Sequence, residues 1–358
     1  MDMISFGSVF LELVFGHVPA LPLRGEEIYT DEFAISCGGA VNSASAAASA
    51  GARAGLCTVL GDDLGSRVVI EHCGRAGVDL SSSLRVRRRA AGITVVLNFD
   101  DDRAFVTHVP PRPASEQPEL ERWRSVLRRE RPRWCYLHGG PGVAAFLRDA
   151  RALGSRVVLD ISLGDERHRR DAIIDCVRLA DVFVPNEDEL RALTATATTE
   201  AAVAAAAGWG TPLVVKRGPA GALVCGPDGV TEVTAGLRQV TVRDRTGAGD
   251  AFAGAMIAAL VRGAPLAEAV VAANAAGSDA VARLGGVGEV DVPGISTADR
   301  SLGSQFVDTV ARAAAQHAAG AAATDQTAAA QAAAAQAAAA QAAAAEPAAA
   351  ETGKEHGE

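Results

Sequence analysis

The sequence predicts an α/β protein with a central, mostly parallel β-sheet, helices on both faces of that sheet and a small β lid. From residue 134 onward, short apolar segments rich in β-branched residues alternate with helical stretches, as in parallel sheets that are covered on both sides. The expected strands are 134–138, 156–160, 181–185, 213–216 and 222–225, and the helices between the first four are 141–153, 168–179 and 187–206.

The rest of the chain completes this pattern with elements of the same two kinds. Short apolar runs predict strands, and runs of small or apolar residues bounded by glycine or proline predict helices. The expected strands are 3–7 and 54–60, and the expected helices are 40–50, one that begins at 61–65, 251–262 and 265–284.

Two segments are expected to form the small β lid outside the main sheet. Residues 25–36 look extended and are of mixed polarity. Residues 92–108 alternate with period two and are interrupted by the charged turn 100–103, a pattern that predicts a hairpin. We therefore place the lid at about residues 12–36 and 92–110.

The composition argues against several classes of protein. The 358 residues carry a formal net charge of -9 with a pI near 5.4, so the chain has no basic footprint for nucleic acid. Its 6 cysteines are scattered without C-x-x-C spacing, which favours reduced core residues of a cytoplasmic protein over a disulfide framework or a zinc site. The N-terminus lacks the basic region and the long apolar stretch of a signal peptide.

Residues 301–358 differ from the rest of the chain in composition. Ala-Ala-Ala-Ala-Gln recurs through residues 331–345, which favours a frayed helix because alanine has the highest helix propensity. The regular glutamines and the weakly apolar alanines argue against membrane insertion. We therefore expect one domain over residues 1–300, followed by an Ala/Gln-rich low-complexity tail.

One stretch, D-R-T-G-A-G-D-A-F, carries the clearest chemical signal. Residues 239–242 before it alternate like the end of a strand, and a helix follows it. Gly247, Ala248 and Gly249 are therefore expected at a strand-to-helix turn, where unpaired backbone N–H groups and the helix dipole attract an anion such as a phosphoryl group. Asp250 would place a carboxylate beside that anion, which suits a base that accepts a hydroxyl proton during attack on phosphorus.

A simpler interpretation of this stretch is an ordinary capped helix, since Asp and Gly are common at helix starts. Two better-known phosphate motifs are absent from it. It lacks G-x-x-x-x-G-K-[ST], and Phe252 stands where a dinucleotide fingerprint needs Gly or Ala.

Two further stretches place polar residues beside glycines or at a strand end. Gly38 and Gly39 open a helix that carries Asn42, so the chain can approach a ligand there, although tight helix packing explains the same pattern. Asn186 and Glu189 lie where an expected strand ends and a helix begins, the edge at which open α/β sheets bind ligands. Acidic residues also favour helix N-termini for electrostatic reasons alone.

In combination these stretches resemble the ribokinase-like, or PfkB, carbohydrate kinases. D-x-T-G-A-G-D-A-F is similar to the C-terminal signature of that family, and G-G-A-V-N at residues 38–42, G-D-D-L-G at residues 61–65 and N-E-D-E at residues 186–189 resemble the elements that precede it in the family. The resemblance covers roughly residues 3–290 and implies the ribokinase-like fold. It implies an ATP-dependent kinase that phosphorylates a hydroxymethyl group of a sugar or sugar-like molecule, with Asp250 as base and the N–H groups of 247–249 as an anion hole.

The resemblance implies roles for residues on the acceptor side. Gly38, Gly39 and Asn42 would contact the sugar. Glu12 stands where many members of the family carry a sugar-binding Asp. Because Glu extends one methylene further, the identity of the acceptor stays open.

The resemblance also implies residues for the metal and the nucleotide. Asn186 and Glu189 would help to place Mg²⁺, largely through water, since Mg²⁺ keeps much of its hydration. Arg245 occupies a slot where the family often has Thr or another uncharged residue. The residues implied for the nucleotide side are Lys216, Gly218, Gly221, Thr246 and Asn274.

Other interpretations stay open at this point. A nucleoside kinase of the same fold would differ only in what fills the acceptor pocket. A non-catalytic ligand-binding relative is a third interpretation, against which the intact Asp250 and its glycines argue. The sequence leaves open whether a monovalent cation is needed, and whether a homodimer forms through the lid. A small-molecule acceptor is the expected partner, and neither nucleic acid nor a membrane is expected.

We predict that the tail from Ala313 onward is dispensable for catalysis, because alanine and glutamine dominate it and offer little with which to complete a pocket. A truncation that ends at Arg312 should keep kcat/KM within about threefold of the full chain, a difference below ~1 kcal/mol. A hundredfold loss in a truncated protein with an unchanged circular dichroism spectrum would contradict this prediction.

Overall fold

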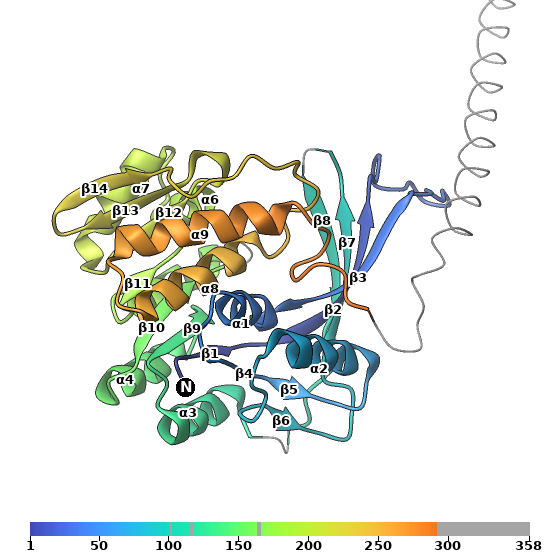
Figure 1. The fold of residues 1–358 in the computed structure, drawn as a ribbon, viewed down its shortest axis with the longest axis horizontal. Helices are drawn as coiled ribbons and strands as arrows, with labels where there is room; N and C mark the ends of the chain where they lie inside the picture. Colours follow the sequence, from blue (N-terminus) through green and yellow to red (C-terminus); the bar gives the residue numbers. More distant parts are fainter. Residues whose placement is uncertain (101, 115–116, 163–165, 292–358) are drawn as a thin grey trace, which may run out of the picture. The chain divides into compact units, whose positions relative to one another are not determined.

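The computed structural model describes residues 1–100, 102–114, 117–162 and 166–291, and in this part of the chain one eight-stranded sheet forms the centre (Figure 1). Neighbouring strands from β4 to β12 are parallel, and the edge strands β13 and β14 are antiparallel. In spatial order the strands are β14 (Gly229–Val233), β13 (Ala222–Gly226), β12 (Leu213–Lys216), β11 (Val182–Phe183), β10 (Arg156–Asp160), β9 (Trp134–His138), β1 (Met3–Phe6) and β4 (Ala54–Cys57).

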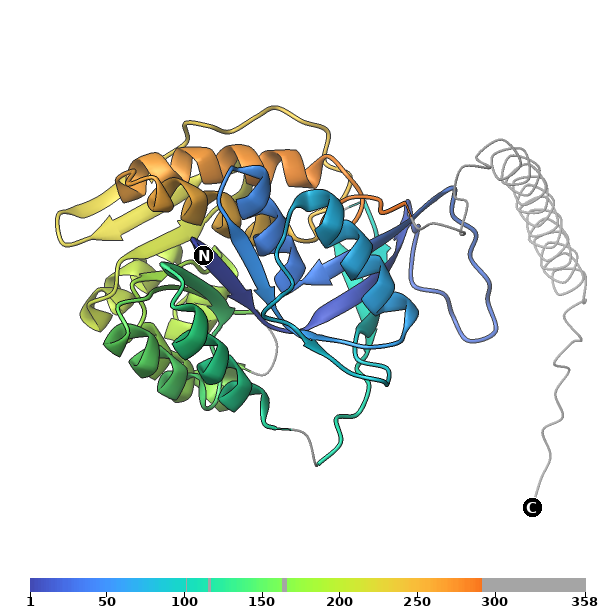
Figure 2. The same ribbon diagram turned by 60° about the horizontal axis from the view of Figure 1, so that its bottom comes forward.

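Successive side chains of the strands point to opposite faces of this sheet and form two apolar cores, one on each face. Helices cover both cores (Figure 2). Trp134 and Tyr136 of β9 belong to one core, and Cys135 and Leu137 belong to the other. One face packs against α1 (Ala40–Ser49), α8 (Ala248–Val261) and α9 (Leu266–Val281), and the other against α3 (Glu119–Glu130), α4 (Val143–Ala152), α5 (Glu166–Val177), α6 (Glu187–Thr194) and α7 (Thr199–Ala206).

A four-stranded sheet, here called the lid sheet, stands beside the main one. It has the order β3 (Glu32–Gly39), β2 (Val9–Gly16), β7 (Gly92–Asn98) and β8 (Arg103–His108), and α2 (Leu64–Ala76) packs next to β2. Only two residues separate β1 from β2, and β3 passes directly into α1. A short parallel pair, β5 (Val59–Leu60) and β6 (Leu84–Arg85), completes the described strands.

The predicted fold class is confirmed, and the predicted strands 134–138, 156–160 and 213–216 have the observed bounds. The expected strand 54–60 is divided into β4 and β5, because Val59 and Leu60 pair with β6 and not with β1. Two further predictions were wrong. Residues 239–242 form no strand, because the chain there approaches α9 instead of pairing with the sheet, and the next N–H groups, of Arg243 and Asp244, donate to the carbonyl oxygen of Val281.

The second correction concerns residues 187–206, which form two helices and not one. Ala195 adopts the left-handed conformation with φ 55, which ends α6, and Thr198 caps α7 through a hydrogen bond from the N–H of Ala201. Ala has no short polar side chain to favour that conformation, so the alanine-rich sequence gives no signal of the break.

The cysteines are all free thiols, and every one except Cys225 is buried. Among the described residues, no helix is long and apolar enough to span a membrane. The predicted tail 301–358 lies outside the described residues, so the domain boundary near residue 300 stays a prediction.

Candidate active site

The Gly-Ala-Gly turn lies at the start of α8, as the sequence predicts. Gly247 caps the helix with φ 72, a conformation that favours glycine. A Cβ there would come within 2.7 Å of the Gly286 Cα and 2.9 Å of the Asn42 Nδ2. The backbone of Ala248 and Gly249 therefore begins the helix at a crowded point where a side chain on residue 247 has no room.

Asp250 follows this turn, and three side chains converge on its carboxylate. The Tyr136 hydroxyl donates to Oδ1 at 2.8 Å, and the Asn42 amide donates to Oδ2 at 3.2 Å. His138 Nε2 lies 3.7 Å from Oδ1. Burial acts to raise the pKa of Asp250, but His138 and the hydrogen bonds from Tyr136 and Asn42 outweigh it and lower this pKa. Asp250 is therefore ionised at neutral pH.

His138 interacts in turn with the Asp250 carboxylate. Its Nδ1 lies 2.9 Å from the hydroxyl of Ser162. Burial acts to lower its pKa, but Asp250 and then Asp160 overcome that effect, and the pKa of His138 is raised. The imidazole therefore gains positive charge beside the carboxylate more readily than a free histidine.

Asp160 and Lys216 extend this network toward the Gly-Ala-Gly turn. Lys216 Nζ donates to Asp160 Oδ2 at 2.7 Å, and the Tyr136 hydroxyl lies 3.0 Å from the same oxygen. Because a tyrosine hydroxyl has one proton to donate, Tyr136 serves two carboxylates with a single donor. A Cβ on Gly249 would lie 3.1 Å from Lys216 Nζ, so the ammonium group lies directly beside the Gly-Ala-Gly turn.

Asn186 and Glu189 form a reciprocal capping box at the start of α6. The Glu189 N–H donates to Asn186 Oδ1 at 2.8 Å, and the Asn186 N–H donates to Glu189 Oε2 at 2.7 Å. Burial raises the pKa of Glu189 to about 7, opposed by Lys216 and supported by Asp160. Within the described ranges, no group of three His, Cys, Asp or Glu side chains is placed to hold a metal ion by itself.

The acceptor-side residues of the prediction come together at the base of the lid sheet. Glu12 of β2 is 5% exposed, and its Oε2 accepts a hydrogen bond from the Gly286 N–H at 3.1 Å. A side chain at Gly38 of β3 would collide with the other carboxylate oxygen. A side chain at Gly286 would collide with the Asn42 amide, whose Oδ1 is buried without a hydrogen-bond partner. One amide oxygen thus remains unsatisfied beside Asp250.

The residues predicted for the nucleotide lie in two places. Thr246 precedes the turn, and its N–H donates to Asp244 Oδ1 at 2.8 Å. Gly218 and Gly221 bound a short turn before β13. The Asn274 amide donates to the carbonyl oxygens of residues 233 and 235, at 2.9 Å each. Asn274 therefore holds the segment that follows β14, and its role toward a nucleotide stays a prediction.

Sequence reasoning missed four functional candidates: Tyr136, His138, Asp160 and the role of Asp244. The first three lie in or at the ends of β9 and β10, and the C-terminal edge of parallel strands is where such residues gather. Asp244 is 2% exposed and ties the turn to the last loop, because its Oδ2 accepts from the Gly285 N–H at 2.8 Å. The signal was available in the polar residues that close two otherwise apolar strands.

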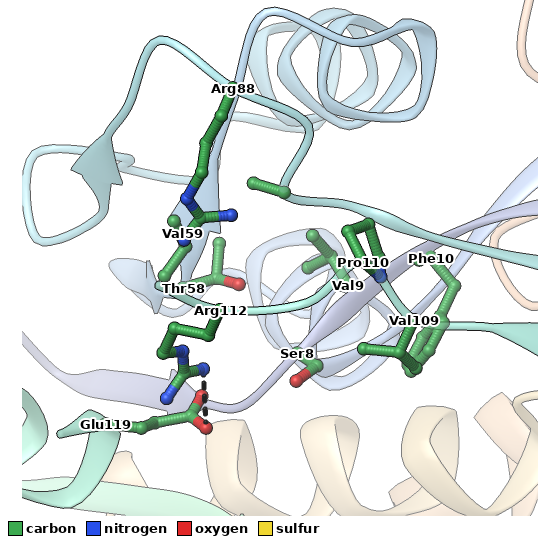
Figure 3. A pocket seen from close by; sticks show the side chains of 12 residues that line it. Ser8, Val9, Phe10, Thr58, Val59, Arg88, Val109, Pro110, Arg112 and Glu119 are labelled. Carbon is green, nitrogen blue, oxygen red and sulfur yellow. Dashed lines mark hydrogen bonds and ion pairs between the residues drawn. The ribbon is translucent and has the colours of Figure 1, made fainter. Parts of the chain in front are cut away.

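Two hollows were found in the described part of the chain, and Asp250 lines neither of them. One has a volume of about 290 Å³ and lies at the start of β2 (Figure 3). The other, of about 230 Å³, lies between the turn of the β7–β8 hairpin and residues 241–245. The candidate site is therefore defined by converging polar groups and not by either hollow.

Comparison with known proteins places these observations in a family. The fold is that of the ribokinase-like α/β proteins, shared with an E. coli protein described as ribokinase II and solved with ATP and Mg²⁺, at TM-score 0.67 and 23% identity over 80% of this chain and 94% of that chain. A family model for pfkB family carbohydrate kinases matches residues 4–291. The chain belongs to the pfkB family of carbohydrate kinases.

Individual relatives share about a quarter of their residues with this chain. A cytidine kinase of Thermococcus kodakarensis is 26% identical over 287 residues, which cover 72% of this chain and 91% of that protein. The structure of a PfkB protein from Polaromonas sp. JS666 is 27% identical with TM-score 0.63, over 80% of this chain and 97% of that one. The names of these similar proteins thus include a cytidine kinase and a ribokinase.

We predict that Glu12 makes the stability of the protein depend on pH. Burial raises the pKa of Glu12 to about 7 from an ordinary value of 4.5, with Asp244 and Asp250 adding to the effect and the Gly286 N–H opposing it. A raised pKa contributes stability that is fully present below pH 4.5 and is lost as the pH rises through 7. Relative to Glu12→Gln, the wild-type free energy of unfolding should fall by roughly 2–3 kcal/mol between pH 5 and pH 8.

Urea unfolding of both proteins at the two pH values measures this difference. The exposed Glu268→Gln in α9 is the matched control and should follow the wild type. A gap between wild type and Glu12→Gln that stays constant with pH would contradict the prediction.

Proposed function

We propose that the protein transfers the γ-phosphoryl group of ATP to a hydroxymethyl group of a sugar or sugar-like acceptor. The acceptor oxygen forms a bond to the γ-phosphorus, and the bond from that phosphorus to the oxygen bridging to the β-phosphate breaks. ADP leaves with the electron pair of the broken bond. The hydroxyl proton passes to Asp250 and then to solvent, so the products are the phosphate ester and ADP.

The observation that carries this proposal is the position of an ionised carboxylate at the N-terminus of α8. Backbone N–H groups at the start of α8 and the Lys216 ammonium would supply positive charge where the transferred phosphoryl group would lie. The N–H of Ala248 also donates to the carbonyl oxygen of Arg245, at a long 3.4 Å. Asp250 is a weak base with a lowered pKa, so it suits proton transfer late in the reaction. Positioning and charge stabilisation would then supply most of the rate.

The residues at the start of α6 fit a hydrated magnesium ion. The capping box uses Asn186 Oδ1 and Glu189 Oε2, which leaves the second carboxylate oxygen of Glu189 for a water of the ion. Mg²⁺ bound with ATP would neutralise charge on the phosphates. Lys216 lies beside the turn at Gly249, and its pKa is raised because Asp160 and Glu189 together outweigh the effect of burial.

A nucleoside acceptor is the second candidate, supported by the similarity to the cytidine kinase of Thermococcus kodakarensis. Both acceptors present a hydroxymethyl group on a ring with neighbouring hydroxyls. Glu12 and Asn42 would accept or donate hydrogen bonds to those hydroxyls in either case. Production of ADP from ATP, measured across sugars, sugar acids, sugar phosphates and nucleosides, distinguishes the two.

We predict that Asp250→Asn lowers kcat by about 10²–10⁴-fold, because the amide keeps the shape of the side chain but cannot take the proton. The dissociation constant for ATP should change by no more than a few-fold. Asp228→Asn, in the exposed turn between β13 and β14, is the matched control and should leave both quantities unchanged. An Asp250→Asn enzyme with more than a tenth of wild-type kcat would rule out Asp250 as the base.

A further inference from the structure

His138 lies beside the carboxylate of Asp250 but has no task in the proposed reaction as described so far. Its Nε2 is 3.7 Å from Asp250 Oδ1 and 3.4 Å from the hydroxyl oxygen of Tyr136. The rings of Tyr136 and His138 pack edge to face, with centroids 5.8 Å apart and planes at 87°. The imidazole is therefore held next to the group that would take the acceptor proton.

The other ring nitrogen of His138 has a partner that suits both protonation states. Nδ1 lies 2.9 Å from the hydroxyl oxygen of Ser162, which follows β10. A hydroxyl group both donates and accepts, so Ser162 can hold this nitrogen with or without its proton. Part of the His138 side chain is open to solvent, whereas Tyr136 and Asp160 are buried. The ring can therefore gain and lose a proton in place, and water can reach it.

The other side chains that contact Asp250 are poor acceptors of a proton. Burial and the neighbouring carboxylates raise the pKa of Tyr136 well above its ordinary value, so this hydroxyl keeps its proton. The Asn42 group that faces Oδ2 is an amide N–H₂, which only donates. Lys216 already carries its proton, since its pKa is raised. Among the described side chains at this carboxylate, His138 is of the type that exchanges protons near pH 7.

The electrostatics of the pair favour transfer from the carboxyl group to the ring. Burial opposes ionisation of Asp250, but His138 and the hydrogen bonds to the carboxylate lower the pKa of Asp250. Burial acts to lower the pKa of His138 as well, but Asp250 and Asp160 outweigh it and raise this pKa. A proton that arrives on Asp250 is therefore more stable on the neighbouring imidazole.

We propose that His138 receives the acceptor proton from Asp250 and passes it to solvent. This proposal rests on the proposed function and extends its last step. The O–H bond of protonated Asp250 breaks as an N–H bond forms at His138 Nε2, which leaves a carboxylate beside an imidazolium. Water then takes a proton from the imidazolium and restores the neutral ring. The separation of 3.7 Å must shorten by about 0.7 Å, and such contacts often tighten when substrate binds.

The relay operates only while His138 is neutral, because an imidazolium cannot accept a second proton. The kcat/KM for the acceptor should therefore rise with pH through an apparent pKa above the ordinary histidine value of 6.5. The titratable and charged groups that act on this ring are Asp250 of α8, Asp160 of β10, Lys216 of β12, Glu189 of α6 and Tyr136 of its own strand.

His138→Gln tests this pH dependence, because glutamine is polar but cannot carry the proton. At pH 8 its kcat/KM for the acceptor should be on the order of tenfold below that of the wild type. The difference should shrink toward pH 6, where His138 is protonated in the wild type. Glu12 and Glu189, whose pKa values are raised to about 7, are present in both proteins, so the ratio of the two isolates His138. The exposed His108→Gln in β8 is the matched control and should follow the wild type.

Chemical rescue separates a proton relay from a structural role. His138→Ala removes the ring, and free imidazole added to the assay can then accept the proton in its place. At pH 8 imidazole should raise the kcat/KM of His138→Ala by about threefold or more, in proportion to the concentration of its neutral form. It should leave the wild type and Asp250→Asn unchanged, because one has its own imidazole and the other lacks the base.

The outcomes separate this proposal from the proposed function. A ratio of wild type to His138→Gln that is the same at every pH, with no rescue of His138→Ala, would overturn the relay while leaving a kinase. If no acceptor yields ADP, the proposed function fails. NMR titration of the His138 ring then still decides whether the two groups share a proton. In Asp250→Asn the ring should bind its proton about tenfold less tightly than in the wild type, and equal affinity refutes the relay.

Discussion

The single hydroxyl proton of Tyr136 is the constraint around which the candidate site is arranged. Asp250 and Asp160 both lie within hydrogen-bonding distance of this hydroxyl, and the hydroxyl belongs to a side chain that is 1% exposed. Two carboxylates this close repel one another unless positive charge lies nearby. Lys216, which donates to Asp160, and His138, which lies beside Asp250, supply that charge, so the two carboxylates and the two cations form one electrostatic unit.

This group of four side chains connects the central sheet with the helices on one of its faces. Tyr136 and Asp160 belong to neighbouring central strands, whereas Asp250 belongs to a helix packed on the sheet. Asn42 brings in a second helix of the same face. The carboxylate that would take the proton is thus held by elements from distant parts of the sequence, which limits its freedom to turn away from an acceptor.

The fold could be predicted from the sequence where the hydrophobic pattern of a segment matches its place in the folded protein. The apolar runs at 134–138 and 156–160 have the length and composition of buried parallel strands, and both form such strands. The small residues that follow the Gly-Ala-Gly turn favour a closely packed helix, and α8 begins there. Residues 239–242 alternate just as clearly but have no strand to pair with, and sequence alone does not tell which edges of the sheet are taken. For the candidate site, the glycine signature pointed to Asp250. Tyr136 lies in the middle of an apolar strand, whose pattern explains it equally well, whereas Asp160 closes its strand, a signal that the sequence reasoning did not use.

The direct passage of β3 into α1 has a mechanical consequence. Gly39 is the joint between the lid sheet and the helix that carries Asn42, and its φ of 80 concentrates the change of direction at one residue. A displacement of the lid sheet relative to the main sheet would therefore be transmitted directly to the first turn of α1. The position of the lid sheet and the orientation of the Asn42 amide, which donates to Asp250, are therefore linked through the backbone of one residue.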